Sequence, residues 1–259
     1  RRKPVFGIRA CLNRSPCVKI PPSVSEQRAA LGVLSVIIPV LNAADRISVE
    51  IVRWLESSAA DEVIVVDGGS DDGTPDLARL AGARVLTAPR GRGSQLAAGA
   101  GAATGDWLLF IHADTHLGPG WQTVTKRFMA DPANRFRAAY FRFALDDQSS
   151  AARRLEKVVE WRCRYLGLPY GDQGLLIGAD YYDKLGGYEA IPLMEDVALA
   201  RKIPNHRLQA LHADAVTSAV RYRHDGYVLR PARNLLCLAL YFIGVPPVGL
   251  VELYEGRKR

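Results

Sequence analysis

Four short apolar segments, each of the first three followed by a stretch with helical character, fill residues 33–114 and constrain the fold more than any other feature. Both faces of each segment are apolar, as expected of parallel strands covered by helices on either side. After the first segment, Ile47, Ile51, Trp54 and Leu55 recur at helical spacing. This order predicts a β-α-β-α-β-α-β unit and an α/β fold. The strand-like segments are VLSVIIPVLN (33–42), EVIVVD (62–67), ARVLTA (83–88) and DWLLFIHAD (106–114).

The alternation is looser after Asp114. Residues 138–145 have the pattern of a strand, residues 152–166 that of an amphipathic helix, and residues 170–187 that of a strand, a helix and a glycine stop. A helix is also predicted within 192–203, with Glu195 and Asp196 in its first turn. Acids are favoured there by the helix dipole, so their position alone does not indicate catalysis.

The C-terminal region contains an apolar run, Leu235 to Val251, which Pro246 and Pro247 interrupt. A transmembrane helix needs about 20 uninterrupted apolar residues, so the proline pair argues against one. We expect two short helices packed on the core. The alternative is contact with a membrane surface, aided by the basic residues 257–259.

The net charge of +7 favours anionic partners such as nucleotide phosphates or acidic lipids, and no nucleic-acid-binding motif is present. The four cysteines form no C-x-x-C pair, so a disulfide framework or structural zinc site is not predicted. Residues 1–32 are basic and contain no acid before Glu26. We expect a poorly ordered leader there, either a targeting segment or a remnant of processing.

Three acids stand where predicted elements change direction: Asp67, Asp114 and Asp196. Ligands of open α/β sheets bind at the carboxyl ends of the strands, so these acids are candidates for one crevice. Taken singly, each also suits a turn or a helix cap. Two other motifs are rejected: DGGSDDGT lacks the glycine and final acid of a calcium loop, and GRGSQL lacks the third glycine of a dinucleotide fingerprint.

The segment HADTH raises a different hypothesis. In an extended backbone His112, Asp114 and His116 point to one side and could hold zinc for hydrolysis, although no H-E-x-x-H motif accompanies them.

Four motifs in order, SVIIPVLN, VIVVDGGSDDGT, GDWLLFIHAD and LMEDVALARK, resemble those of the family 2 glycosyltransferases over roughly residues 33–203. More narrowly, PRGRGSQLAAGA, HADT, YGDQG and FIGVPPVGLVELYE resemble the arsenosugar-biosynthesis or selenodomain-associated subgroup. The resemblance implies an A-type nucleotide-sugar fold at 33–225, a Rossmann-like and mostly parallel sheet flanked by helices, followed by a C-terminal helical appendage at 226–259.

The resemblance also implies a donor site for a nucleotide diphosphate-sugar, with a UDP-sugar favoured. Asp67 would hydrogen-bond the nucleobase, although the second acid of the family's V-D-D-G-S motif is Gly68 here. Either Arg90 or Arg92 would meet the nucleotide, and His112 replaces the first acid of the D-x-D motif. The remaining residues implied for the donor are Pro39, Val40, Leu41 and Ala113.

On the reacting side, the resemblance implies that Asp114 ligates Mg²⁺ or Mn²⁺ and that Asp196 is the general base of an inverting transfer to a hydroxyl acceptor. Asp172, Gln173 and Glu195 would line the acceptor side. We expect a cytoplasmic enzyme, with peripheral membrane contact or organellar targeting as alternatives. The competing hypotheses are the hydrolase and a non-catalytic protein that binds nucleotide sugars.

Overall fold

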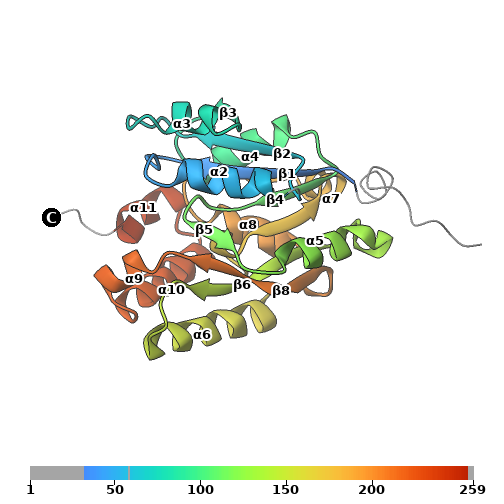
Figure 1. The fold of residues 1–259 in the computed structure, drawn as a ribbon. Coiled ribbons are helices and arrows are strands. Elements are labelled where there is room, and N and C mark those ends of the chain that lie inside the picture. The colour runs from blue at the N-terminus through green and yellow to red at the C-terminus, as the bar shows by residue number, and fades with distance from the viewer. Residues whose placement is uncertain (1–31, 58, 256–259) are drawn as a thin grey trace, which may run out of the picture.

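The computed structural model describes residues 32–57 and 59–255. The predicted leader, residues 1–32, therefore lies outside the described part except for Gly32. Within the described part, the strands form one eight-stranded mixed sheet in the order β3-β2-β1-β4-β7-β6-β8-β5. Figure 1 shows this sheet between helices on both faces.

The parallel half of the sheet contains the predicted alternating unit. β1 pairs with β2 and β4, and β2 pairs with β3, all in parallel. Because these strands are apolar on both faces, neighbouring residues of β1 enter different cores: Ile38 packs on one side and Ile37 on the other. The elements are β1 (Leu34–Val40), α2 (Ile47–Glu56), β2 (Glu62–Asp67), α3 (Thr74–Leu80), β3 (Arg84–Thr87), α4 (Arg92–Ala102) and β4 (Trp107–Phe110).

Helices cover each face through aromatic and branched side chains. On one side α2 and α3 join α5 (Trp121–Ala130), where Trp54 meets Trp121 edge to face at 4.9 Å. On the other, Leu96 of α4 packs with residues of α7 (Ala179–Lys184) and α8 (Glu195–Lys202). The predicted α/β fold, with helices on both faces of the sheet, is confirmed.

In the second half of the sheet the alternation of parallel strands and helices ends, because most of the strand pairs there are antiparallel. β7 (Leu175–Gly178) is antiparallel to both β4 and β6 (Ala138–Leu145), and β5 (Thr115–Leu117) is antiparallel to β8 (Leu208–Thr217). Only β6 and β8 pair in parallel here, with a register shift after Phe141. The amphipathic α6 (Ser150–Leu166) covers β6.

The chain ends in three helices, α9 (Val220–Asp225), α10 (Leu229–Phe242) and α11 (Pro247–Glu255). Leu238 and Leu250 pack against Val197 of α8, so these helices belong to the same body as the sheet. The two short helices predicted for the tail are therefore confirmed. Among the described residues, no helix combines the length and apolar character that crossing a membrane requires.

Candidate active site

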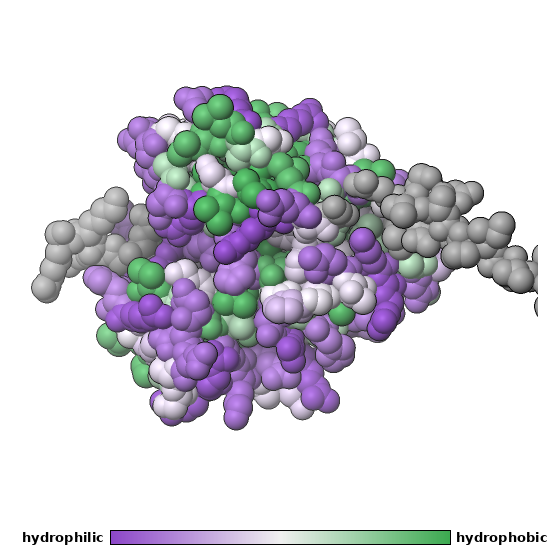
Figure 2. Space-filling view, in the orientation of Figure 1, coloured by the Kyte–Doolittle hydropathy of each residue, from purple (hydrophilic) through white to green (hydrophobic). Residues whose placement is uncertain are grey.

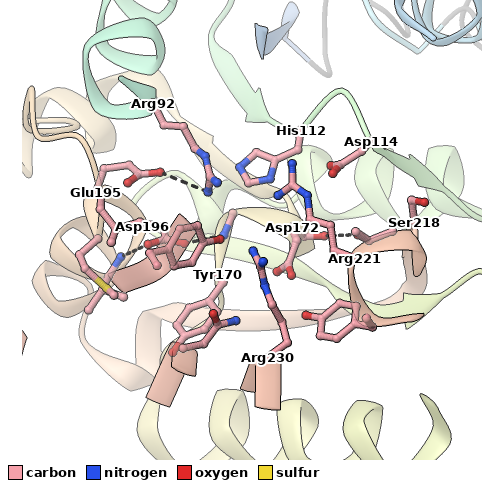
Figure 3. A pocket seen from close by; sticks show the side chains of 18 residues that line it. Arg92, His112, Asp114, Tyr170, Asp172, Glu195, Asp196, Ser218, Arg221 and Arg230 are labelled. Carbon is pink, nitrogen blue, oxygen red and sulfur yellow. Dashed lines mark hydrogen bonds and ion pairs between the residues drawn. The ribbon is translucent and has the colours of Figure 1, made fainter. Parts of the chain in front are cut away.

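A pocket opens where the end of β4, the first turn of α8 and the C-terminal helices converge (Figure 3). Asp114 and Asp196, 82 positions apart in sequence, both line it. Asp67, the third acid singled out from the sequence, does not. The charged residues around the pocket are Arg92, Asp114, Asp172, Glu195, Asp196, Arg221 and Arg230.

His112 and Asp114 reach the pocket because β4 ends at Phe110 and the chain turns at once. The ring of His112 packs on Gly171, where a Cβ atom would lie 2.6 Å from Nε2. Nε2 is buried and has no hydrogen-bond partner. Burial and the nearby Arg92 lower the pKa of His112 to about 4, so its imidazole is neutral near pH 7.

Glu195 and Asp196 are presented by a strained backbone. Met194, the residue before α8, has φ +67°, a left-handed conformation that costs a residue other than glycine roughly 1 kcal/mol or more. Oδ2 of Asp196 accepts a hydrogen bond from the backbone N–H of Gly171 at 2.9 Å, and Oδ1 accepts one from the Val197 N–H at 2.7 Å. The carboxylate is thereby fixed between α8 and the turn before β7.

Glu195 is buried, and its Oε2 has no hydrogen-bond partner. Burial, followed by the charge of Asp196, raises its pKa to about 7, while Arg92 opposes the shift. The Arg92 guanidinium lies 3.9 Å from Oε1. Arg92 and Glu195 therefore attract each other as an ion pair, but no short hydrogen bond joins them.

Asp172 lies in a 3₁₀ turn, η2 (Gly171–Gln173), and its buried Oδ1 has no hydrogen-bond partner. Burial raises its pKa to about 6. An unsatisfied buried carboxyl group that faces a pocket is a candidate for contact with a ligand.

The C-terminal helices supply a wall that the sequence did not reveal. Arg221 of α9, Arg230 of α10 and Tyr254 of α11 all line the pocket. Tyr254 has its ring 5.9 Å from the Arg92 guanidinium and 5.1 Å from that of Arg230. The boundary predicted at 225/226 thus runs through the residues that line one pocket, and the C-terminal helices contribute to that pocket. Of these three residues, only Tyr254 lies in a motif that the sequence analysis singled out, FIGVPPVGLVELYE.

The remaining donor residues lie at the ends of β1 and β2. Val40 pairs with Asp67 in register, which places Pro39 and Leu41 beside it along the chain. Asp67 is buried, and its carboxylate accepts hydrogen bonds from the N–H groups of Gly69 and Ser70 at 2.9 and 3.0 Å. The turn interpretation of Asp67 is correct, and its contact with a nucleobase stays a prediction.

The structure shows which of the two arginines, Arg90 or Arg92, reaches the pocket, a choice that the sequence left open. Arg92 is the first residue of α4 and lines the pocket, whereas Arg90 is exposed before the helix and does not. Ala113 packs against the apolar core beside the pocket, which leaves His112 and Asp114 as the polar residues of HAD in the lining.

Gln173 does not line the pocket, unlike its neighbour Asp172. It is buried, and Oε1 accepts hydrogen bonds from Arg162 at 3.1 Å and from the Tyr170 N–H at 3.2 Å. Nε2 donates to the Phe141 carbonyl at 3.2 Å. The Gln173 amide is therefore occupied by hydrogen bonds within the protein, and it has no free polar group for the expected contact with an acceptor.

The zinc hypothesis fails on geometry. His116 lies in β5, opposite Val216 of β8, and does not line the pocket that contains His112 and Asp114. No group of three or more histidine, cysteine or acidic side chains suited to a metal ion occurs in residues 32–57 and 59–255.

Comparison with known proteins identifies a family and a fold that this chain matches. The model of the family described as Glycosyl transferase family 2 matches residues 35–167, more than half of the 259-residue chain. No curated protein matches the sequence.

Solved structures share the fold at low sequence identity. Glucosyl-3-phosphoglycerate synthase from Mycobacterium tuberculosis, in complex with Mn²⁺, UDP-glucose and phosphoglyceric acid, matches with a TM-score of 0.59 and 17% identity, covering 89% of this chain and 87% of that chain. Mannosyl-3-phosphoglycerate synthase from Rubrobacter xylanophilus matches with a TM-score of 0.57 and 17% identity, covering 91% and 83%. The A-type fold expected from the resemblance is confirmed.

Proposed function

Because the chain belongs to glycosyl transferase family 2, we propose that it transfers a sugar from a nucleotide diphosphate-sugar to an acceptor hydroxyl with inversion at the anomeric carbon. The observation that carries the proposal is the shared pocket of Asp114 and Asp196. A UDP-sugar is the favoured donor, since the M. tuberculosis synthase of the same fold is known with UDP-glucose bound. Within the family, the motifs YGDQG and FIGVPPVGLVELYE favour the arsenosugar-biosynthesis subgroup.

Asp114 is the residue we assign to a divalent cation, Mn²⁺ or Mg²⁺. Its carboxylate faces the pocket, accepts no hydrogen bond and forms no ion pair with the described residues, so its oxygens suit a hard cation. Such an ion would supply positive charge that offsets the charge of the departing diphosphate.

The side chains around Asp114 suit a diphosphate. Arg92 and Arg221 bring positive charge to the same side of the pocket (Figure 3), where it would be complementary to phosphate oxygens. Neutral His112 would hydrogen-bond the ribose or a phosphate, because a neutral imidazole offers one donor and one acceptor nitrogen.

Asp196 is the proposed general base. As the acceptor oxygen attacks the anomeric carbon, its proton moves to the Asp196 carboxylate, and the bond from that carbon to the diphosphate oxygen breaks on the opposite side. The N–H groups of Gly171 and Val197 orient the carboxylate. Asp172 and Glu195 line the same pocket and would hydrogen-bond the hydroxyl groups of the acceptor.

The experiment measures the release of UDP from UDP-sugars in water with Mn²⁺, since glycosyltransferases without an acceptor often hydrolyse the donor slowly. We expect Asp196→Asn to reduce release by about 100-fold or more while UDP still binds. Asp183→Asn, which changes an exposed acid of α7, is the matched control and should release UDP at the wild-type rate. Unchanged release in Asp196→Asn would refute the base, and UDP binding without any release would support a non-catalytic binding protein.

A further inference from the structure

One face of α10 is exposed and entirely apolar. Every residue of the helix that is exposed is aliphatic or aromatic, and these residues recur at helical spacing. The exposed fractions of four of them reach 68% for Leu229, 65% for Leu235, 49% for Leu236 and 46% for Phe242. We name this surface the apolar stripe, and it consists of Leu229, Ala232, Leu235, Leu236, Ala239 and Phe242.

The apolar stripe is not the face by which α10 packs on the protein. The inner face carries Cys237 and Leu238, which contact residues of α8, and Arg230 and Asn234, which line the pocket. A helix on the surface of a globular protein normally directs polar residues outward. In Figure 2, apolar residues interrupt the hydrophilic surface at the lower left, over the region where Figure 1 draws α9 and α10.

The apolar surface continues beyond the helix. Val228 precedes α10 and is 77% exposed, and Ile243 follows it at 77%. Contiguous exposed apolar side chains of this kind usually mark an interaction site.

An unpaired positive charge lies next to the apolar stripe. Arg201 lies with its guanidinium 4.9 Å from the ring centre of Phe242 and forms no ion pair within the described residues. The two arginines of α10, Arg230 and Arg233, are both paired with Asp225 of α9, at 2.9 and 3.7 Å, so Arg201 carries the unpaired charge. In an isologous dimer built on this face, Arg201 would find no acid in the apolar stripe of the second copy, and near the symmetry axis the two Arg201 cations would repel each other. An anionic surface has the complementary charge.

We propose that the apolar stripe and Arg201 form a docking surface for an anionic lipid membrane, with α10 lying in the plane of the headgroups. Leucine and phenylalanine side chains would enter the acyl boundary, and Arg201 would contact lipid phosphates. Arg230 and Asn234, on the opposite side of the same helix, would hold the pocket about one helix diameter, ~10 Å, above the membrane. The surface is defined by exposure and charge and does not depend on the proposed reaction.

A second apolar patch provides the comparison. In Figure 2 it covers α2 and α3, and its large side chains include Val49 and Leu80. There the arginines are paired with acids of the same helix, Arg53 with Glu50 at 2.7 Å and Arg79 with Asp76 at 2.8 Å. That patch lacks the unpaired positive charge that an anionic membrane attracts.

The test is sedimentation of the full chain with vesicles of phosphatidylcholine, alone or with about 30% phosphatidylglycerol. We expect binding to the anionic vesicles, weaker binding to the neutral ones, and a decrease as NaCl rises from about 0.1 M to about 0.5 M. The double variant Leu235→Glu/Leu236→Glu should lose roughly tenfold or more in partitioning, and Arg201→Gln about fivefold. Leu80→Glu changes a leucine of the other patch that is even more exposed, at 85%, and this variant should bind as the wild type does.

Three results would overturn the proposal. The first is a wild type that does not sediment with anionic vesicles. The second is a Leu80→Glu variant that loses as much binding as the double variant. The third is a double variant that binds as the wild type does. Light scattering during size-exclusion chromatography tests whether a second copy of the chain covers the stripe instead. If the wild type is a dimer that does not bind vesicles, and the double variant is a monomer, the stripe is a dimer interface. Circular dichroism confirms that each variant is folded.

Discussion

The backbone N–H of Gly171 donates a hydrogen bond to Oδ2 of Asp196 across 2.9 Å, and this contact joins two segments 25 residues apart. Because Gly171 has no side chain, the His112 ring packs directly against its Cα. The end of β4, the turn before β7 and the start of α8 therefore meet at one glycine.

Replacing Gly171 by alanine should damage catalysis more than stability. The added Cβ would lie 2.6 Å from Nε2 of His112, so either the ring or the turn that holds Asp196 must move. We expect UDP release to fall by roughly 10- to 100-fold, because small displacements of reacting groups are costly. Steady-state rates and thermal melting measure the two effects. A rate close to that of the wild type would show that the contact does not position the site.

The close approach of α4 to the loop before α8 depends on Gly93. A Cβ there would lie 2.1 Å from the Glu189 carbonyl oxygen, and neither backbone can yield easily. We expect Gly93→Ala to cost about 2 kcal/mol or more, and to move Arg92 away from Glu195. On the same helix Gly101 has open space around its Cα, so Gly101→Ala should stabilise the protein by about 0.5–1 kcal/mol. Urea unfolding measures both, and equal effects would contradict the packing described.

The raised pKa of Asp172 predicts a stability that depends on pH. Burial raises this pKa from 3.8 to about 6, so the folded protein holds the proton more tightly than the unfolded chain does. The stabilisation is complete below about pH 4 and is lost as the pH rises through 6. Asp172→Asn should remove this dependence and, at pH 8, raise the free energy of unfolding by about 1–3 kcal/mol relative to the wild type. The measurement is urea unfolding at several pH values without ligand, and parallel curves for the two proteins would contradict the assignment.

Gln173 should behave as a structural residue. Its amide forms hydrogen bonds with Arg162, Tyr170 and Phe141, and their loss leaves buried polar groups without partners. We expect Gln173→Ala to reduce the free energy of unfolding by about 2–4 kcal/mol at every pH, whereas Gln148→Ala, at an exposed position, should change it by less than about 0.5 kcal/mol. A stable Gln173→Ala protein with specifically weakened acceptor binding would restore the prediction made from sequence.

The part of the fold that could be predicted is the part encoded by local patterns. β1, β2 and β4 are apolar on both faces, which is enough to identify parallel strands between helices. Asp114 follows directly from this, because a polar residue at the carboxyl end of such a strand lies at the ligand-binding edge. The prediction of Asp196 as the base depended on the family resemblance. An acid in the first turn of a helix is already explained by the helix dipole, so its position alone does not indicate catalysis.

The rest depends on packing between distant segments. Arg230 is 8% exposed and faces the pocket only because α10 packs on α8, and its own sequence neighbourhood resembles any helix with an apolar face. Gln173 and Asp172 are adjacent, yet one turns inward and the other faces the pocket. The reversal of β7 also escapes local patterns, because parallel and antiparallel buried strands are equally apolar.

The proposed reaction requires a nucleotide diphosphate to bind beside Asp114 through a divalent cation. Isothermal titration of UDP into the full chain, with Mn²⁺ and with a chelator in its place, tests this most directly for the wild type and Asp114→Ala. We predict binding by the wild type that requires Mn²⁺ and is weakened by about 100-fold or more in the variant. Equal UDP affinity of the two proteins in Mn²⁺ would refute a cation held by Asp114, as would wild-type affinity that the chelator leaves unchanged.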